Sequence, residues 1–92
     1  MFLEIVSPEA ILFKGEVDSV AVPGVNGEFQ MLNNHAPIVS LLQEGSVKIY
    51  GNIELTGKFK DRFSKDNKGV TLLPISSGTI ELKDNKVIIL AD

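Results

Sequence analysis

The residues best suited to chemistry lie in the stretch PGVNGEFQMLNNHAP, residues 23–37. It holds the only histidine of the chain, His35, and one carboxylate, Glu28, among glycine, proline and asparagine turn signals. An imidazole and a carboxylate are groups that general acid–base catalysis and metal binding commonly use. A site of either kind needs further partners held within reach of these two groups.

The rest of the sequence offers few such partners. The absence of cysteine excludes thiol nucleophiles and thiolate–metal sites, and a single histidine excludes a multi-histidine metal centre. Neither the G-x-S-x-G nucleophile elbow nor a glycine-rich phosphate-binding motif is present. The 12 Asp and Glu residues could still pair for glycosidase-type chemistry, although a small sandwich rarely has a deep cleft. We predict no catalytic, cofactor-binding or metal-binding residues, while a hydrolase using His35 and a pH-dependent role of its imidazole stay open.

Length and charge narrow the class of protein. The 92 residues fit one domain spanning 1–92, and the apolar runs are far too short to cross a bilayer. The net charge of −3 argues against a general nucleic-acid binder. One basic cluster, KFKDRFSKDNK at 58–68, is either a solvated face or a contact for an acidic partner or lipid headgroups.

The elements that must position these residues are strands. Apolar and polar residues alternate with a period of two in LEIV, GEFQML, GSVKIY and TIELK, and turn signals recur between them. This pattern predicts an all-β sandwich or barrel, with a hairpin turn at Asp84-Asn85. The run APIVSLL, 36–42, is apolar at both alternations, so we expect it to be covered on both sides. Residues 58–66 carry Phe59 and Phe63 at helical spacing, and a short helix, a strand and an irregular excursion stay open there.

Five strings resemble one known family. They are LEIVSPE at 3–9, LFKGEVD at 12–18, VPGVNGE at 22–28, NNHAP at 33–37 and LLQEGSVKI at 41–49, and SSGTIELKDNKVIILAD at 76–92 adds a sixth. In this order they resemble the N-terminal half of the epsilon subunit of F-type ATP synthase. The family's Pro-Gly before His-Ala-Pro is replaced by Asn33-Asn34. Its Ser-Gly-Gly motif is Ser76-Ser77-Gly78 here, and residues 51–75 match poorly.

The resemblance implies a flattened β-sandwich of about ten strands, without the C-terminal helical hairpin that usually follows in this family. It also implies a non-catalytic central-stalk subunit that links gamma to the c-ring and couples ion flow to ATP synthesis. Such a protein lies peripherally at the cytoplasmic face of a bacterial inner membrane, held by the complex and not inserted. It uses no cofactor, small-molecule substrate or nucleic acid. The alternative is a stand-alone β-sandwich adaptor or ligand-binding module.

By the same resemblance, the ring-facing residues are Glu28, Asn33, Asn34 and His35, with Glu28 paired to a basic side chain of the ring. Contacts with gamma are expected to be apolar, because sandwiches expose few large apolar groups without reason. The candidates for that contact are Val20, Val22, Ile38 and Leu42.

Overall fold

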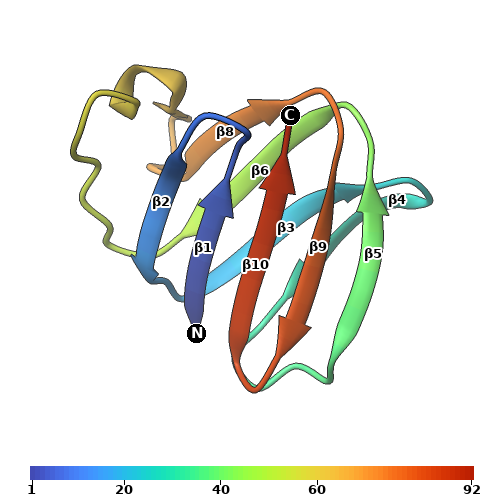
Figure 1. Ribbon diagram of the computed structural model, residues 1–92. Helices are drawn as coiled ribbons and strands as arrows, with labels where there is room; N and C mark the ends of the chain where they lie inside the picture. Colours follow the sequence, from blue (N-terminus) through green and yellow to red (C-terminus); the bar gives the residue numbers. More distant parts are fainter.

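The computed structural model describes residues 1–92 and is built almost entirely of strands (Figure 1). The strands are β1 (Phe2–Val6), β2 (Ile11–Glu16), β3 (Ser19–Gly24), β4 (Gly27–Met31), β5 (Ile38–Leu42), β6 (Gly45–Tyr50), β7 (Ser64–Lys65), β8 (Thr71–Ile75), β9 (Gly78–Lys83) and β10 (Lys86–Ala91). The only helical element is a 3-10 turn at Lys60–Arg62, and no helix is long and apolar enough to cross a membrane. The prediction of an all-β fold with about ten short strands is confirmed.

The strands form one sheet that curls into two layers. The hydrogen-bonded order is β2-β1-β10-β9-β5-β3-β6-β8-β7, and β4 pairs with the opposite edge of β3. In Figure 1 the β2-β1-β10-β9-β5 layer lies in front, and β3, β6 and β8 cross behind it. A single residue pair, Gly24 with Leu42, joins β3 to β5 at the corner between the layers.

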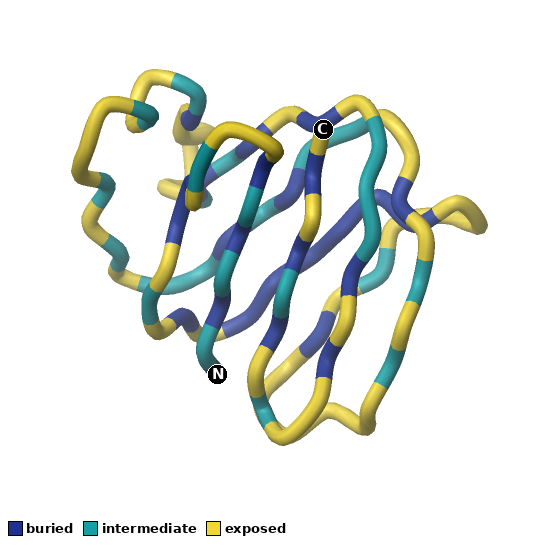
Figure 2. Tube along the Cα trace, viewed as in Figure 1, coloured by how far each residue is buried: buried dark blue, intermediate teal, exposed yellow.

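The core lies between the two layers. Alternate residues of most strands are buried, as the dark bands in Figure 2 show. The residues with the largest fully buried side chains are Leu3, Ile5, Val20, Val22, Met31, Val47, Ile49, Leu73, Ile80, Leu82, Val87 and Ile89. The period-two pattern of the sequence therefore points its apolar residues into one shared core.

Strand β5 differs from its prediction. Its outer residues Val39 and Leu41 are 75% and 62% exposed, whereas Leu42 is buried and Ile38 is half-buried. The expectation that 36–42 is covered on both sides is therefore wrong. The reason is that only the inner face of this layer meets the other layer, and no element packs on its outer face.

Two turns require particular backbone conformations. The β9–β10 hairpin turns at Asp84 and Asn85, which both have positive φ, at 52° and 61°. This is the geometry of a two-residue type I′ turn, so the predicted hairpin is confirmed. At the start of β9, a Cβ on Gly78 would lie 2.4 Å from the carbonyl oxygen of Leu90, so glycine is needed there.

The stretch 51–70, between β6 and β8, is the least regular part of the chain. It contains the 3-10 turn and the two-residue β7, so the region left open at 58–66 combines a helical turn with a short strand. Phe63 is buried, and Phe59 packs against the core. The basic side chains of 58–68 form no ion pair with any carboxylate of the chain.

Candidate partner-binding surfaces

Glu28 lies at the start of β4, directly after the tight β3–β4 turn. The register pairs Gly24 with Gly27 and Pro23 with Glu28, and Gly27 has a φ of 119° that favours glycine. The carboxylate is therefore held at a rigid hairpin tip, on the outer side of the rear layer. It is half-exposed and available to a partner.

Glu28 already has a partner within the chain. Lys48 of β6 places its Nζ 3.0 Å from Oε1 of Glu28. The hydrogen bond that Lys48 donates to Glu28, together with the negative charge of that carboxylate, raises the pKa of Lys48 above the usual value, so the lysine stays cationic. No local pattern in the sequence predicts this pair, because only the β4-β3-β6 register brings residues 28 and 48 together.

The turn at Asn33 and Asn34 is tied to the β9–β10 hairpin. The Asn34 backbone N–H donates to Oδ1 of Asn85 at 2.9 Å, and the Asn85 side-chain amide donates to Oδ1 of Asn33 at 2.8 Å. The amino group of Met1 also donates to Asn33 Oδ1, at 3.1 Å. Asn34 has a φ of 64°, a left-handed conformation that asparagine adopts more readily than most residues.

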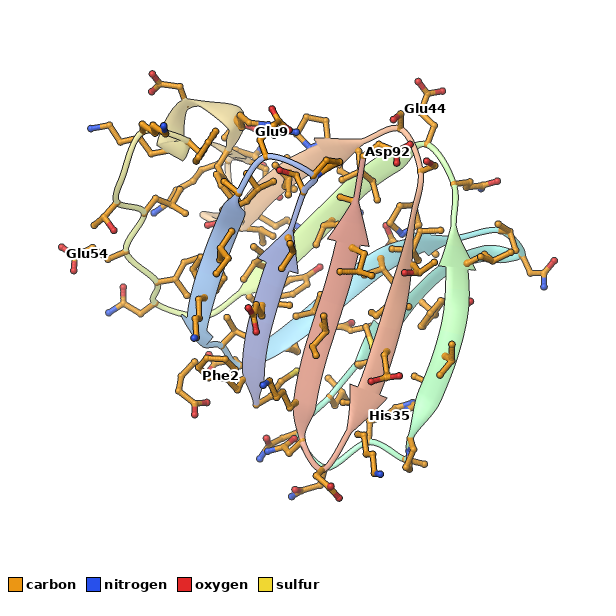
Figure 3. All side chains as sticks on the ribbon, in the orientation of Figure 1. Phe2, Glu9, His35, Glu44, Glu54 and Asp92 are labelled. Atoms are coloured by element: carbon orange, nitrogen blue, oxygen red, sulfur yellow. The ribbon has the colours of Figure 1, made fainter.

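His35 follows this turn and is exposed (Figure 3). Its Nδ1 lies 2.7 Å from the carbonyl oxygen of Ala36, which can only accept, so Nδ1 carries the proton. No three His, Asp or Glu side chains gather where they could hold a metal ion. Glu28 lies near the start of β4, whereas His35 follows the turn after the end of that strand, so the strand separates the two residues. Residues 23–37 therefore do not bring the imidazole and the carboxylate together into one site.

The residues predicted to contact gamma are mostly core residues. Val20 and Val22 are 0% exposed and Leu42 is 3% exposed, so their side chains have no surface to offer a partner. This corrects the expectation for these three positions, because their alternation points them between the layers. Only Ile38, which is half-buried, keeps partial access.

Exposed apolar side chains lie instead across the outer face of the front layer. The register aligns Ile11 with Val6, Val6 with Leu90, Leu90 with Thr79, and Thr79 with Leu41. We call these five residues the apolar row. Ile11 and Leu90 are each 52% exposed, and a groove along the row is lined by Val6, Pro8, Val25, Leu41 and Leu90 among others.

Comparisons with known proteins agree with this fold. The family described as ATP synthase, Delta/Epsilon chain, beta-sandwich domain matches residues 1–92. Proteins called ATP synthase epsilon chain from Leptospira borgpetersenii, Leptospira interrogans and Chlorobaculum tepidum are 44%, 38% and 36% identical, each over 98% of this chain. The chain spans 59% of the length of the two Leptospira proteins and 86% of the Chlorobaculum protein.

Two solved structures share the fold at low identity. A chain of the Euglena gracilis mitochondrial ATP synthase gives a TM-score of 0.72 at 20% identity, covering 97% of this chain and 48% of that one. A chain from the central stalk and c-ring of the Tetrahymena thermophila mitochondrial enzyme gives 0.67 at 16%, covering 99% and 62%. The match of the family to the whole sequence, together with these relatives, shows that the chain belongs to the ATP synthase delta/epsilon family through its β-sandwich domain.

Proposed function

We propose that the chain is a non-catalytic rotor subunit of a proton-translocating F-type ATP synthase, with residues 1–92 acting as one sandwich unit. It links gamma to the c-ring, so that rotation driven by ion flow reaches the catalytic head. The observation that carries this proposal is the family match over the full sequence. The complex holds the domain at the cytoplasmic face of a bacterial inner membrane.

The architecture suits a mechanical task. A close-packed sandwich cross-braced by ladder hydrogen bonds resists deformation, and the core contains no buried side-chain polar atom without a partner. The regions proposed to function lie on the surface of the sandwich, where a coupling subunit needs to contact its partners.

The two surfaces fit two different partners. The apolar row is the contact proposed for gamma, because burying its side chains removes exposed hydrocarbon from water. The Glu28 hairpin tip is the contact proposed for the c-ring. Asn33, Asn34 and His35 lie at the other end of β4, and we assign them a supporting position at the rim of the ring contact.

The test replaces this chain in the assembled ATP synthase with a Glu28→Lys variant. We expect lower proton-driven ATP synthesis in inverted membrane vesicles, because a like charge would then face the basic ring side chain. Glu54→Lys is the matched control, since Glu54 is exposed, makes no ion pair and lies at the far side of the sandwich (Figure 3).

Synthesis that falls for Glu28→Lys and not for Glu54→Lys supports the ring contact. Equal synthesis in both variants, with normal assembly, rejects it. Failure of the chain to co-purify with gamma and the c-ring would reject the rotor assignment as a whole and favour a stand-alone adaptor.

A further inference from the structure

The ion pair between Glu28 and Lys48 is the only one that joins two side chains in this protein. It lies at the surface, where the two side chains keep 50% and 37% of their exposure. A basic side chain of a partner therefore meets a carboxylate whose charge is already partly compensated. Any contact that a partner makes with Glu28 therefore also involves Lys48.

The fold places this lysine by register. Lys48 on β6 pairs with Ala21 of β3, and Glu28 on β4 pairs with Pro23 of the same strand. Strands β4 and β6 lie on either side of β3, two ladder spacings or about 9.6 Å apart, so the lysine stem must cross β3. Ala21 and Pro23 are short side chains that are themselves buried, which leaves the stem a low path across the strand.

Both charged groups keep unused hydrogen-bonding capacity. Glu28 uses Oε1 for the lysine, and Oε2 has no partner in the chain. The Lys48 ammonium has three donors and meets only this one carboxylate at bonding distance. The carboxylate of Asp66 adds a weaker attraction that also favours the charged lysine. Both ends of the pair can thus bind an outside group at once.

We propose that Glu28 and Lys48 recognise the ring as one oriented charge pair, with Lys48 both positioning the carboxylate and contacting the partner. This inference rests on the proposed ring contact. The ring segment that fits this pair carries a basic group opposite Glu28 and an acidic side chain or carbonyl oxygen opposite Lys48. Complementary charge pairs contribute orientation and discrimination more than affinity, which suits a contact that must keep one register during rotation.

The experiment measures the affinity of the chain for ATP synthase stripped of it, with four variants: Glu28→Gln, Lys48→Gln, Lys48→Arg and the exchange Glu28→Lys/Lys48→Glu. We expect each Gln variant to bind about 2- to 5-fold more weakly, the range of a half-exposed ion pair. Lys48→Arg should retain most of the affinity. The exchange keeps an internal ion pair but reverses its direction, so it should bind no better than either Gln variant.

Lys68→Gln serves as the control, because Lys68 is exposed and its side chain has no carboxylate partner. Thermal unfolding of each isolated variant separates loss of fold from loss of contact. Wild-type affinity for Lys48→Gln or for the exchange variant, while Glu28→Gln is weakened, overturns this inference and leaves the ring contact standing. Wild-type affinity for Glu28→Gln rejects the ring contact itself.

Discussion

The outer faces of the two layers differ in the kind of side chain that they expose to solvent. The front layer exposes hydrocarbon across five strands, with Leu41 at 62% exposure at one end of the apolar row. The rear layer exposes Glu28 and Lys48, whose charges already compensate each other. The first face gains free energy only when a partner covers it, whereas the second gains little from burial and much from correct alignment. In the proposed function, the apolar face of the sandwich thus supplies affinity for one partner, and the charged face supplies the orientation of the other.

Adjacent residues in β5 give the sharpest form of this contrast. Leu41 points outward at 62% exposure, and Leu42 points into the core at 3%. We expect Leu42→Ala to lower the free energy of unfolding by about 2–4 kcal/mol, because it leaves a cavity between the layers. Leu41→Ala should change it by less than about 0.5 kcal/mol, as surface substitutions usually do. Urea denaturation of the two isolated variants measures both values, and equal losses would contradict the assignment of faces.

The sequence could predict the class of fold because that information is local. Period-two alternation and the Asp84-Asn85 turn specify strands and a hairpin without any knowledge of their neighbours. The exposed face of 36–42 could not be predicted, because a run that is apolar on both faces does not show which face meets another layer. The burial of Val20 and Val22 escaped prediction for the same reason.

The candidate site was predicted only at the level of its residue types. Glu28 is available at a hairpin tip, as expected, but its ion pair with Lys48 depends on the order of three strands. The resemblance groups Asn33 and Asn34 with Glu28 as ring-facing residues, whereas Glu28 lies near the start of β4 and the asparagines follow its end. The distance between two residues on different strands depends on strand order and register, and a local sequence pattern does not predict either.

The apolar row can be tested directly as the gamma contact. We expect Leu41→Glu to weaken binding of the isolated gamma subunit by at least about 10-fold, because a carboxylate would be buried at the interface without a partner. The free energy of unfolding of the chain should hardly change. Leu32→Glu is the matched control, since Leu32 is 60% exposed but lies outside the row.

Titration calorimetry with the two variants decides the result. Equal weakening by Leu41→Glu and Leu32→Glu would show that added negative charge, and not the row, reduces binding. Normal binding by Leu41→Glu would remove the row from the gamma contact and shift attention to the half-buried Ile38.

The smallest effect expected concerns the polar face and depends on pH. Glu28 raises the pKa of Lys48 above its ordinary value of 10.5, so the folded chain holds that proton more tightly than the unfolded chain. The resulting stabilisation is complete below pH 10.5 and disappears as the pH rises through the higher folded value. Wild type should therefore exceed Lys48→Gln in unfolding free energy by the same small amount at pH 7 and pH 9, and by less at pH 11.5 and above. Comparing the two proteins at each pH cancels the contributions to stability that both proteins share. A difference that stays constant into this alkaline range would mean that the lysine stabilises the sheet through its packed stem across β3, and that its charge is reserved for the partner.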